Sequence, residues 1–264
     1  MSQTRAEPVD RHLNEERRRI ILEKLNREGR VLVSQLAEEL SISPVTVRND
    51  LNSLAREGLV LRAHGGAVKA ESTLLDRQIG EKAQLHTAEK AAIAAKAATF
   101  VSSGHCVVLD SGSTTTAVAR AIKPLKNLTV ITNALNIAVE LTDSPGVEII
   151  LTGGVLRRNS LSVVGHLAED VLRGLTADIM FLGVDGIDPQ FGYTTPNLLE
   201  SRVNHQMIRI SKETIVVADS SKFGRRSLAV ICPVDQARRI ITDSGVDPRY
   251  VRELEALGIE MIIV

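Results

Sequence analysis

Seven short runs of valine, isoleucine and leucine recur along the second part of the chain, and helical or loop stretches separate them. The runs are residues 106–110, 128–132, 147–152, 179–185, 214–219, 239–243 and 259–264. Strands that are apolar along their whole length are buried on both faces, which is typical of a parallel sheet with helices on each side. We therefore predict a mostly parallel α/β domain over residues 87–264, beginning with an alanine-rich helix at Thr87.

Polar residues follow most of these runs at the point where the predicted strand ends. The endings are Asp110-Ser-Gly-Ser-Thr-Thr, Thr132-Asn133, Thr152-Gly-Gly, Asp185-Gly and Asp219-Ser-Ser-Lys, with Asp243-Ser-Gly echoing the pattern. Ligands of parallel sheets bind at the carboxyl ends of the strands, where such groups converge. The pattern predicts a small polar ligand at this edge of the domain.

Two of these segments have the chemistry of a phosphate site. Residues 111–115 offer hydroxyls and backbone N–H groups just before a predicted helix, and a helix N-terminus attracts anions. Residues 152–165 add arginines and hydroxyls, while strand-end aspartates suit the hydroxyls of a sugar. A hydroxyl-rich turn is also an ordinary helix cap, which is the structural alternative. The candidate ligand-binding residues are Asp110, Ser111, Gly112, Ser113, Thr114, Thr115, Thr132, Asn133, Gly153, Gly154, Arg157, Ser160, Asp185 and Lys222.

The chain lacks the motifs of nucleotide and metal sites. GxxxxGK[ST] does not occur, and no GxGxxG follows a predicted strand, which disfavours ATP and dinucleotides. Cys106 and Cys232 fit neither a disulfide framework nor a metal-ligand spacing and indicate a reducing compartment. The amino terminus has no apolar signal segment, and no run approaches a membrane span. We expect a cytoplasmic protein without cofactor, metal, catalytic residues or membrane contact.

The first part of the chain predicts three short helices. Residues 15–30 form the first, with apolar positions at helical spacing behind a charged turn, and residues 33–40 form the second. The third begins at Ser43-Pro44, because serine is a favoured N-cap and proline is favoured in the first helical position. It ends at Gly58.

A hairpin follows the third helix. The segment LVLRAHGGAV predicts two strands turned at Gly65-Gly66. Three helices and a hairpin predict a winged helix-turn-helix over residues 14–69, with the helix-turn-helix at about residues 31–50. Residues 70–86 are mixed polar without a sustained period and indicate a linker.

The third helix has two chemically different faces. Val47, Leu51 and Leu54 share one face, and amides and arginines lie opposite. Amides grip adenine, a guanidinium binds guanine or phosphate, and an outward valine contacts a thymine methyl. The alternative is a protein-interaction module, since any small helical bundle has a polar outer face. The candidate DNA-binding residues, two of them in the hairpin, are Ser43, Val45, Thr46, Arg48, Asn49, Asn52, Arg56, Arg62 and His64.

Composition narrows the kind of nucleic acid. The chain has four Phe, two Tyr and no Trp, and none of these lies before Phe100. Stacking of bases on aromatic rings is therefore excluded for the first part, which disfavours RNA and single strands and leaves double-stranded DNA. Residues 1–70 carry 12 basic and 10 acidic side chains, a net charge of +2, against 20 and 22 in the rest. With so little bulk attraction, we expect binding to require two or more copies of the chain.

The segments described above resemble one known family in order along residues 15–264. SISPVTVRNDLNSLAREGLVLRAHGGAV resembles the DNA-binding signature of DeoR-type bacterial repressors, and LDSGSTT, TNALNIA, LTGGVLRR, FLGVDGID and DSSKF resemble their sensor domain. RNDL in place of the commoner RRDL, together with ESRVNHQM and DSSKFGRRSL, is most similar to the AgaR subgroup, which controls N-acetylgalactosamine and galactosamine catabolism.

The resemblance implies a winged helix that binds operator DNA as a dimer or tetramer and a sensor related to ribose-5-phosphate isomerase. Asn49 replaces the family's usual arginine, which removes a phosphate or guanine contact. Asp185, Asp188 and Glu200 match residues that transfer protons in the isomerases, and Glu200 thereby joins the candidate ligand-binding residues. The lysine-containing stretch of the isomerases reads FGYTTPNLL here, and without that cation we expect no isomerisation.

These observations predict a transcriptional repressor that a phosphorylated sugar releases from its operator. Hexosamine 6-phosphate is the favoured effector through the AgaR likeness. Fructose 1-phosphate, tagatose phosphates and glycerol 3-phosphate suit the same anion loop. A different alternative is a sugar-phosphate isomerase fused to a DNA-binding module.

Overall fold

The computed structural model describes residues 8–28, 30–56, 59–63, 65–69 and 76–264. The chain divides into two compact units, Met1–Leu75 and Asp76–Val264, and their hydrophobic cores share no residue. Within the described ranges, no helix combines the length and the apolar character that crossing a membrane requires.

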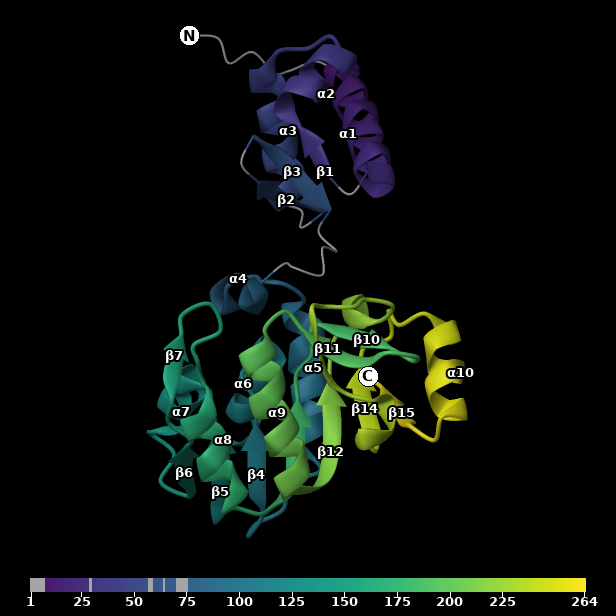
Figure 1. Cartoon of the computed structure of the whole chain (residues 1–264). Helices are drawn as coiled ribbons and strands as arrows, with labels where there is room; N and C mark the ends of the chain where they lie inside the picture. Colours follow the sequence, from purple (N-terminus) through teal and green to yellow (C-terminus); the bar gives the residue numbers. More distant parts are fainter. Residues whose placement is uncertain (1–7, 29, 57–58, 64, 70–75) are drawn as a thin grey trace. The chain divides into compact units, whose positions relative to one another are not determined.

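The smaller unit is a winged helix-turn-helix (Figure 1). Its elements are α1 (Pro8–Glu28), β1 (Arg30–Leu32), α2 (Val33–Glu39), α3 (Pro44–Arg56), β2 (Val60–Ala63) and β3 (Gly66–Lys69). The strands form an antiparallel sheet in the order β1-β3-β2. The predicted helices and hairpin are confirmed, although α1 begins at Pro8. Strand β1 was not predicted, because an alternating pattern cannot be recognised over three residues.

The core of this unit is aliphatic, as the absence of early aromatic residues requires. The α3 residues Val47, Leu51 and Leu54 are at most 1% exposed and pack on α1, α2 and the sheet. The start of α3 also follows the sequence, because the backbone N–H of Thr46 donates to Ser43 Oγ at 3.1 Å. The helix face opposite this core is thereby fixed toward the surface of the unit.

A parallel sheet of seven strands forms the centre of the larger unit, residues 76–264. In spatial order the strands are β15 (Glu260–Ile263), β14 (Arg239–Thr242), β12 (Ser211–Val217), β9 (Ala177–Leu182), β4 (Cys106–Leu109), β5 (Leu128–Thr132) and β6 (Val147–Leu151). Every neighbouring pair is parallel. The seven predicted apolar runs supply these strands, so the predicted α/β architecture is confirmed.

Helices cover both faces of this sheet. One face is covered by α5 (Thr87–Ala98), α6 (Ser113–Ile122) and α7 (Leu135–Leu141), and the other by α8 (His166–Arg173), α9 (Leu198–Ile210) and α10 (Pro248–Ala256). Successive residues of β4 face opposite ways, so Val107 packs in the first core and Val108 in the second. The two largest fully buried side chains, Tyr193 and Phe181, both lie in this unit.

Two small antiparallel sheets were not predicted. Strand β7 (Val155–Arg157) pairs with β8 (Ser162–Val164), and β11 (Gly192–Thr195) lies between β10 (Gly186–Asp188) and β13 (Ala229–Cys232). Two 3-10 helices, η1 (Ser220–Lys222) and η2 (Val234–Gln236), follow β12 and β13. The small sheets lie near the end toward which the arrowheads of the large sheet point (Figure 1). They add to the edge of the large sheet at which its strands end, where the sequence predicted polar residues.

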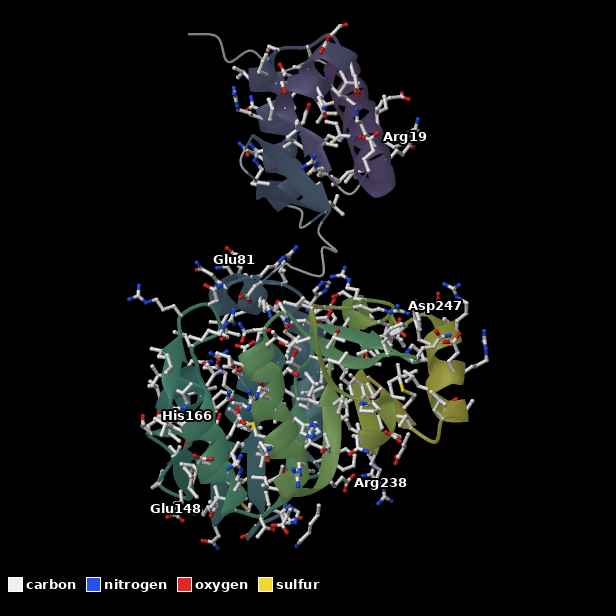
Figure 2. All side chains as sticks on the ribbon, viewed as in Figure 1. Arg19, Glu81, Glu148, His166, Arg238 and Asp247 are labelled. Carbon is white, nitrogen blue, oxygen red and sulfur yellow. The ribbon has the colours of Figure 1, made fainter. Side chains whose placement is uncertain are left out.

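The predicted linker over residues 70–86 requires correction at its C-terminal part. Helix α4 (Ile79–Gln84) lies within it, and the boundary between the units falls between Leu75 and Asp76. Helix α4 buries none of its residues, so it carries no apolar period that a sequence could show. Glu81 of α4 lies at the end of the unit opposite Glu148 and Arg238 (Figure 2). Residues 70–75 lie outside the described part of the chain.

Candidate functional site

A polar pocket lies at the carboxyl end of the large sheet. It forms where the segments after β4 and β9 meet α4, α9 and η1, and it encloses about 40 Å³. Its position is the one at which parallel sheets bind ligands. The lining residues are Arg77, Ile79, Lys82, Asp110, Ser111, Gly112, Ser113, Thr114, Ser160, Gly183, Val184, Asp185, Thr195, Glu200, Asn204 and Lys222.

The turn between β4 and α6, which contains candidate ligand-binding residues, forms one wall. Ser111, Gly112, Ser113 and Thr114 line the pocket at the N-terminus of α6, where the helix dipole favours an anion. Thr115 has a different role from the predicted one. Its hydroxyl accepts a hydrogen bond from the backbone N–H of Gly112 at 2.8 Å and donates to the carbonyl of Asp110. Thr115 therefore closes the turn and is absent from the pocket wall.

Asp110 stands at the floor of the pocket without a cationic hydrogen-bond partner among the described residues. One carboxylate oxygen accepts from the backbone N–H of Gly183 at 3.0 Å, and the other from Asn204 Nδ2 at 3.4 Å. Burial raises the pKa of Asp110 to about 7, and the nearby carboxylates of Glu200 and Asp185 add to the rise. The carboxyl group is thus divided between its two protonation states near neutral pH.

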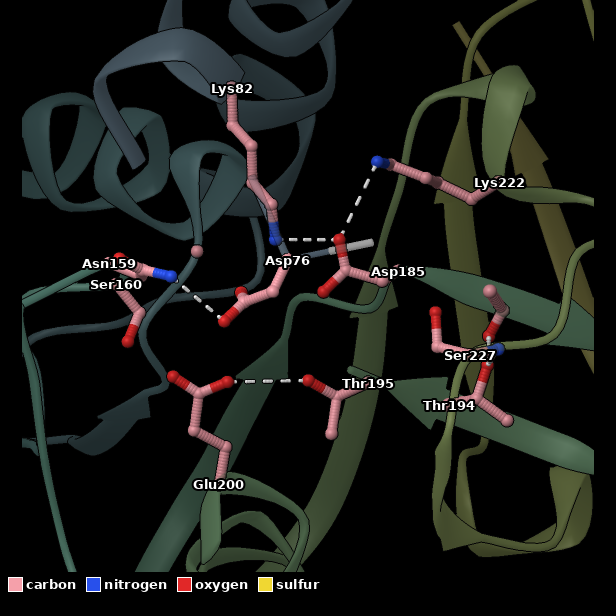
Figure 3. A network of polar contacts seen from close by, with 12 residues as sticks. Asp76, Lys82, Asn159, Ser160, Asp185, Thr194, Thr195, Glu200, Lys222 and Ser227 are labelled. Carbon is pink, nitrogen blue, oxygen red and sulfur yellow. Dashed lines mark hydrogen bonds and ion pairs between the residues drawn. The ribbon is translucent and has the colours of Figure 1, made fainter. Parts of the chain in front are cut away.

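Asp185 is paired with two lysines from distant parts of the chain (Figure 3). Lys82 Nζ lies 2.7 Å from Asp185 Oδ1, and Lys222 Nζ lies 3.9 Å from the same oxygen. Burial opposes the charged form of Asp185, but the two lysines outweigh burial and lower the pKa of this carboxyl group. Burial also lowers the pKa of Lys222, against the attraction of Asp185. The cationic side of the pocket is thus already engaged with a carboxylate.

Arg157 lies behind this wall rather than in it. Its Nη1 lies 2.9 Å from Glu200 Oε1, and its Nη2 pairs with Asp76. Glu200 also accepts from the hydroxyl of Ser162 at 2.9 Å. Two carboxylates occupy the guanidinium of Arg157, so the structure places it outside the pocket wall, and its role as a phosphate ligand stays a prediction. Ser160 does line the pocket, as predicted.

Four other predicted ligands also lie outside the pocket wall. Thr132 is fully buried, and its hydroxyl accepts from the backbone N–H of Ala134. Asn133 is fully buried, and its Nδ2 donates to the carbonyl of Val163. Glycines 153 and 154 shape the hairpin of β7 and β8. A Cβ at Gly154, whose φ is +119°, would meet the carbonyl oxygen of Val164 at 2.6 Å.

Sequence reasoning missed four polar residues of the pocket wall. Arg77 and Lys82 lie in the stretch taken for a linker, and Thr195 and Asn204 lie on β11 and α9. A lysine in a polar segment carries no sequence signal for the partner it meets 103 residues later. The stretch FGYTTPNLL supplies no lysine, as its sequence shows, and the cations that pair with Asp185 are the candidate Lys222 and the unpredicted Lys82. Asp188 is instead paired with Arg226 and is not part of the wall.

The outward face of α3 has the exposure expected of a DNA-reading helix. Val45 is 62% exposed, and Ser43, Arg48, Asn49 and Asn52 are exposed as well. An outward valine makes no contribution to the core and is available to a partner. Thr46 is half-buried and lies 2.9 Å from Ser43 through the two hydroxyls.

One candidate of the hairpin makes a hydrogen bond within the smaller unit. Arg62 is exposed, and its Nη1 donates to the carbonyl of Gly66 at 2.9 Å, within the hairpin. His64 and the side chain of Arg56 lie outside the described part of the structure. Asp50, the aspartate of the RNDL segment, is buried and pairs with Arg17 Nε at 2.5 Å. Asp50 therefore joins α3 to α1 rather than facing outward.

Both units match models of known domain families. Residues 17–73 match the DeoR-like helix-turn-helix domain. Residues 85–244 match the DeoR C terminal sensor domain. The two matches follow each other along the chain in the order that the sequence resemblance implied.

Relatives of similar length are named as transcriptional regulators. A protein of Escherichia coli O157:H7 named for repression of the aga operon is 39% identical, over 94% of this chain and 93% of its own. The regulator GlpR of Haloferax volcanii is 34% identical, over 94% and 96%. The glycerol-3-phosphate regulon repressor of Escherichia coli K12 is 34% identical, over 85% and 88%.

Solved structures with a similar arrangement include ribose 5-phosphate isomerases. The Plasmodium falciparum enzyme has a TM-score of 0.38 and 19% identity, over 52% of each chain. Ribose 5 phosphate isomerase A of Neisseria gonorrhoeae has a TM-score of 0.38 and 15% identity, over 52% of this chain and 53% of its own. At this distance the likeness carries no statement about activity.

Proposed function

Because this chain belongs to the DeoR family of transcriptional repressors and is a regulator rather than an enzyme, we propose that it represses a sugar or amino-sugar catabolic operon and releases the operator when a phosphorylated sugar binds. The observation that carries the proposal is the pairing of an exposed reading face on α3 with a polar pocket in the sensor unit. We place its action in the cytoplasm, where both proposed ligands are found.

The face of α3 supports major-groove reading of double-stranded DNA. Asn49 and Asn52 present amides, Arg48 presents a guanidinium, and Val45 presents methyl groups. These are the groups that distinguish base edges in the major groove. We propose that the bound form is a dimer or tetramer, because one reader with a net charge of +2 has little attraction for DNA by itself. Sedimentation of the free and DNA-bound protein measures this directly.

The pocket supports a phosphorylated sugar as the effector. The turn at Ser111–Thr114 offers hydroxyls and N–H groups to a phosphate, with Arg77, Lys82 and Lys222 nearby. Asp110, Asp185 and Glu200 can accept hydrogen bonds from sugar hydroxyls. Hexosamine 6-phosphate is our leading candidate, because the relative named for the aga operon is 39% identical. An amino group would find carboxylates in the same wall.

The test uses a duplex selected from a random pool by the full-length protein. Its binding is followed by fluorescence anisotropy while galactosamine 6-phosphate, glucosamine 6-phosphate, fructose 1-phosphate, glycerol 3-phosphate or inorganic phosphate is added. We expect a hexosamine 6-phosphate to release the DNA and inorganic phosphate to be far weaker. Failure of every sugar phosphate to release the DNA would overturn the proposed induction.

A double variant locates the phosphate. Ser113→Ala with Thr114→Ala removes two hydroxyls from the turn but leaves α3 untouched. Hydrogen bonds to charged groups contribute about 1.5–3 kcal/mol each, so with two of them removed release should need at least about 100-fold more effector. Ser102→Ala with Ser103→Ala removes two exposed hydroxyls away from the pocket and serves as the matched control. Unchanged release of the first variant would place the phosphate elsewhere.

A further inference from the structure

The first residues of the larger unit are tied across the edge of the pocket. Asp76 pairs with Arg157 and accepts from Asn159 Nδ2 at 3.1 Å. Lys82 reaches Asp185 at 2.7 Å, and Figure 3 shows Asp76 with Asn159 and Asp185 with Lys82. We name residues 76–85 the strap. Its two ionic anchors lie on groups that surround the pocket.

Backbone contacts hold the same segment between and beyond these anchors. The backbone N–H of Ile79 donates to the carbonyl of Asn159 at 2.6 Å. Lys90, a buried residue of α5, donates from Nζ to the carbonyls of Lys82 at 2.5 Å and Leu85 at 2.6 Å. The strap buries no apolar side chain of α4, so polar contacts hold it in place. Such a segment responds to a change of partner at its anchors.

A ligand in the pocket must compete with these anchors. The pocket is small, with about 40 Å³ of accessible space, and charged side chains that are already paired lie in its wall. Asp185 is engaged by Lys82, and Arg157 behind Glu200 is engaged by Asp76. The first anchor ends on Asp185, which a sugar hydroxyl would also bind, and the second is connected to the pocket through Glu200, the wall residue that pairs with Arg157.

The strap is also the covalent continuation of the DNA-reading unit. The smaller unit ends at Leu75, and the strap begins at Asp76. Any change in how residues 76–85 are held therefore changes where the chain leaves the sensor. An effector can shift the equilibrium only if it prefers one arrangement of this segment.

We propose that residues 76–85 couple the pocket to the DNA-reading unit. The effector binds Asp185 in place of Lys82 and disturbs the Asp76–Arg157 pair. The strap is then held less tightly, and the arrangement of the protein that binds the operator is lost. This inference rests on the proposed function of the chain as an effector-released repressor. It names Lys82 and Asp76 as the residues that hold the repressing state in the absence of effector.

The experiment loosens the strap without effector. Lys82→Gln and Asp76→Asn each remove one anchor and leave the hydroxyl turn at α6 intact. We expect each variant to bind the selected duplex about tenfold more weakly without effector, a size typical of coupling between two sites. Lys82→Arg, which keeps the charge, should restore binding. Lys212→Gln removes an exposed ion pair with Asp178 away from the strap and should bind as the unaltered protein does.

A second measurement follows the strap itself in the full-length protein. Amide hydrogen exchange over residues 79–85 should become faster when galactosamine 6-phosphate is added to the unaltered protein. It should already be fast in Lys82→Gln without that ligand. If the unaltered protein is released by a sugar phosphate but both anchor variants bind DNA and exchange as Lys212→Gln does, the strap proposal is wrong. If no sugar phosphate releases the unaltered protein, the proposed function fails instead.

Discussion

The two units prepare their functional groups in opposite ways. On α3 the amides, the guanidinium and Val45 point away from an aliphatic core and are exposed. In the sensor pocket the described wall holds three carboxylates, Asp110, Asp185 and Glu200, and three cations, Arg77, Lys82 and Lys222. Among these charges, Asp185 pairs with both Lys82 and Lys222. The α3 face can contact DNA without giving up contacts within the protein. A ligand of the sensor pocket must replace contacts that the pocket residues make with one another.

This difference decides what each unit can respond to. An exposed helix face gains new contacts with DNA and loses few existing ones, so its specificity depends on the side chains themselves. A pocket of paired charges gives a ligand no gain unless the ligand's contacts outweigh the pairs it breaks. In the sensor, therefore, binding of a ligand and rearrangement of the paired charges occur together.

A substitution in the core of the smaller unit should have a large effect on operator binding. Leu51→Ala deletes a fully buried side chain from a core that has no aromatic residue to fill the space. A cavity of this kind costs about 2–5 kcal/mol. We expect operator binding to be lost while effector binding by the sensor, measured by calorimetry, is retained. Loss of both activities would show that the two cores are not independent.

A smaller effect tests the buried charge of the sensor. The folded pKa of Asp110, about 7, lies above its usual value of 3.8, so the folded state holds more protons between these values. The Asp110 carboxyl therefore stabilises the fold most at low pH, and this contribution falls by about 1–4 kcal/mol as the pH rises from about 4 to about 7. Asp110→Asn should remove this dependence from the free energy of unfolding in urea.

A carboxyl with the opposite shift provides the control for that measurement. Hydrogen bonds from the backbone N–H of Cys106 and from Lys212 lower the pKa of Asp178. Its contribution to stability is present above the usual pKa of an aspartate and is lost as the pH falls. Asp178→Asn should therefore change the acid side of the stability curve. An Asp110→Asn curve parallel to that of the unaltered protein would contradict the assignment of Asp110.

A substitution on the exposed face of α3 should affect DNA binding with little effect on stability. Asn49→Ala should cost about 1–3 kcal/mol in binding to the selected duplex if the amide reads a base. Because Asn49 is exposed, the free energy of unfolding should change by less than about 0.5 kcal/mol. The measurement is the ratio of affinities for the selected and a scrambled duplex. Gln35→Ala, an exposed amide on α2, should leave this ratio unchanged; an equal change for both variants would contradict base reading by Asn49.

The same contrast explains which features the sequence could reveal. The inner and outer faces of α3 follow from the spacing of Val47, Leu51 and Leu54, which are neighbours along one helix. The parallel sheet follows from apolar runs that are each continuous in the chain. These features are local, so a pattern within a few residues predicts them.

The wall of the pocket depends on contacts between distant residues. Lys82 meets Asp185 across 103 positions, and Arg157 meets Glu200 across 43. The sequence singled out the hydroxyl turn as a segment, but it could not distinguish Thr114, which lines the pocket, from Thr115, which closes the turn. Two adjacent threonines look alike in a sequence, and only the path of the folded backbone decides which of them lines the pocket.

Because all aromatic side chains of Phe, Tyr and Trp type lie at or after Phe100, the smaller unit has no intrinsic ultraviolet fluorescence. The chain has no tryptophan, and Tyr193 and Tyr250 both lie in the sensor, where Tyr193 is fully buried. Intrinsic ultraviolet fluorescence of this protein therefore originates in the sensor alone. A single tryptophan placed in the winged helix would report on that unit without interference, so the two halves of one chain can be observed separately in the same solution.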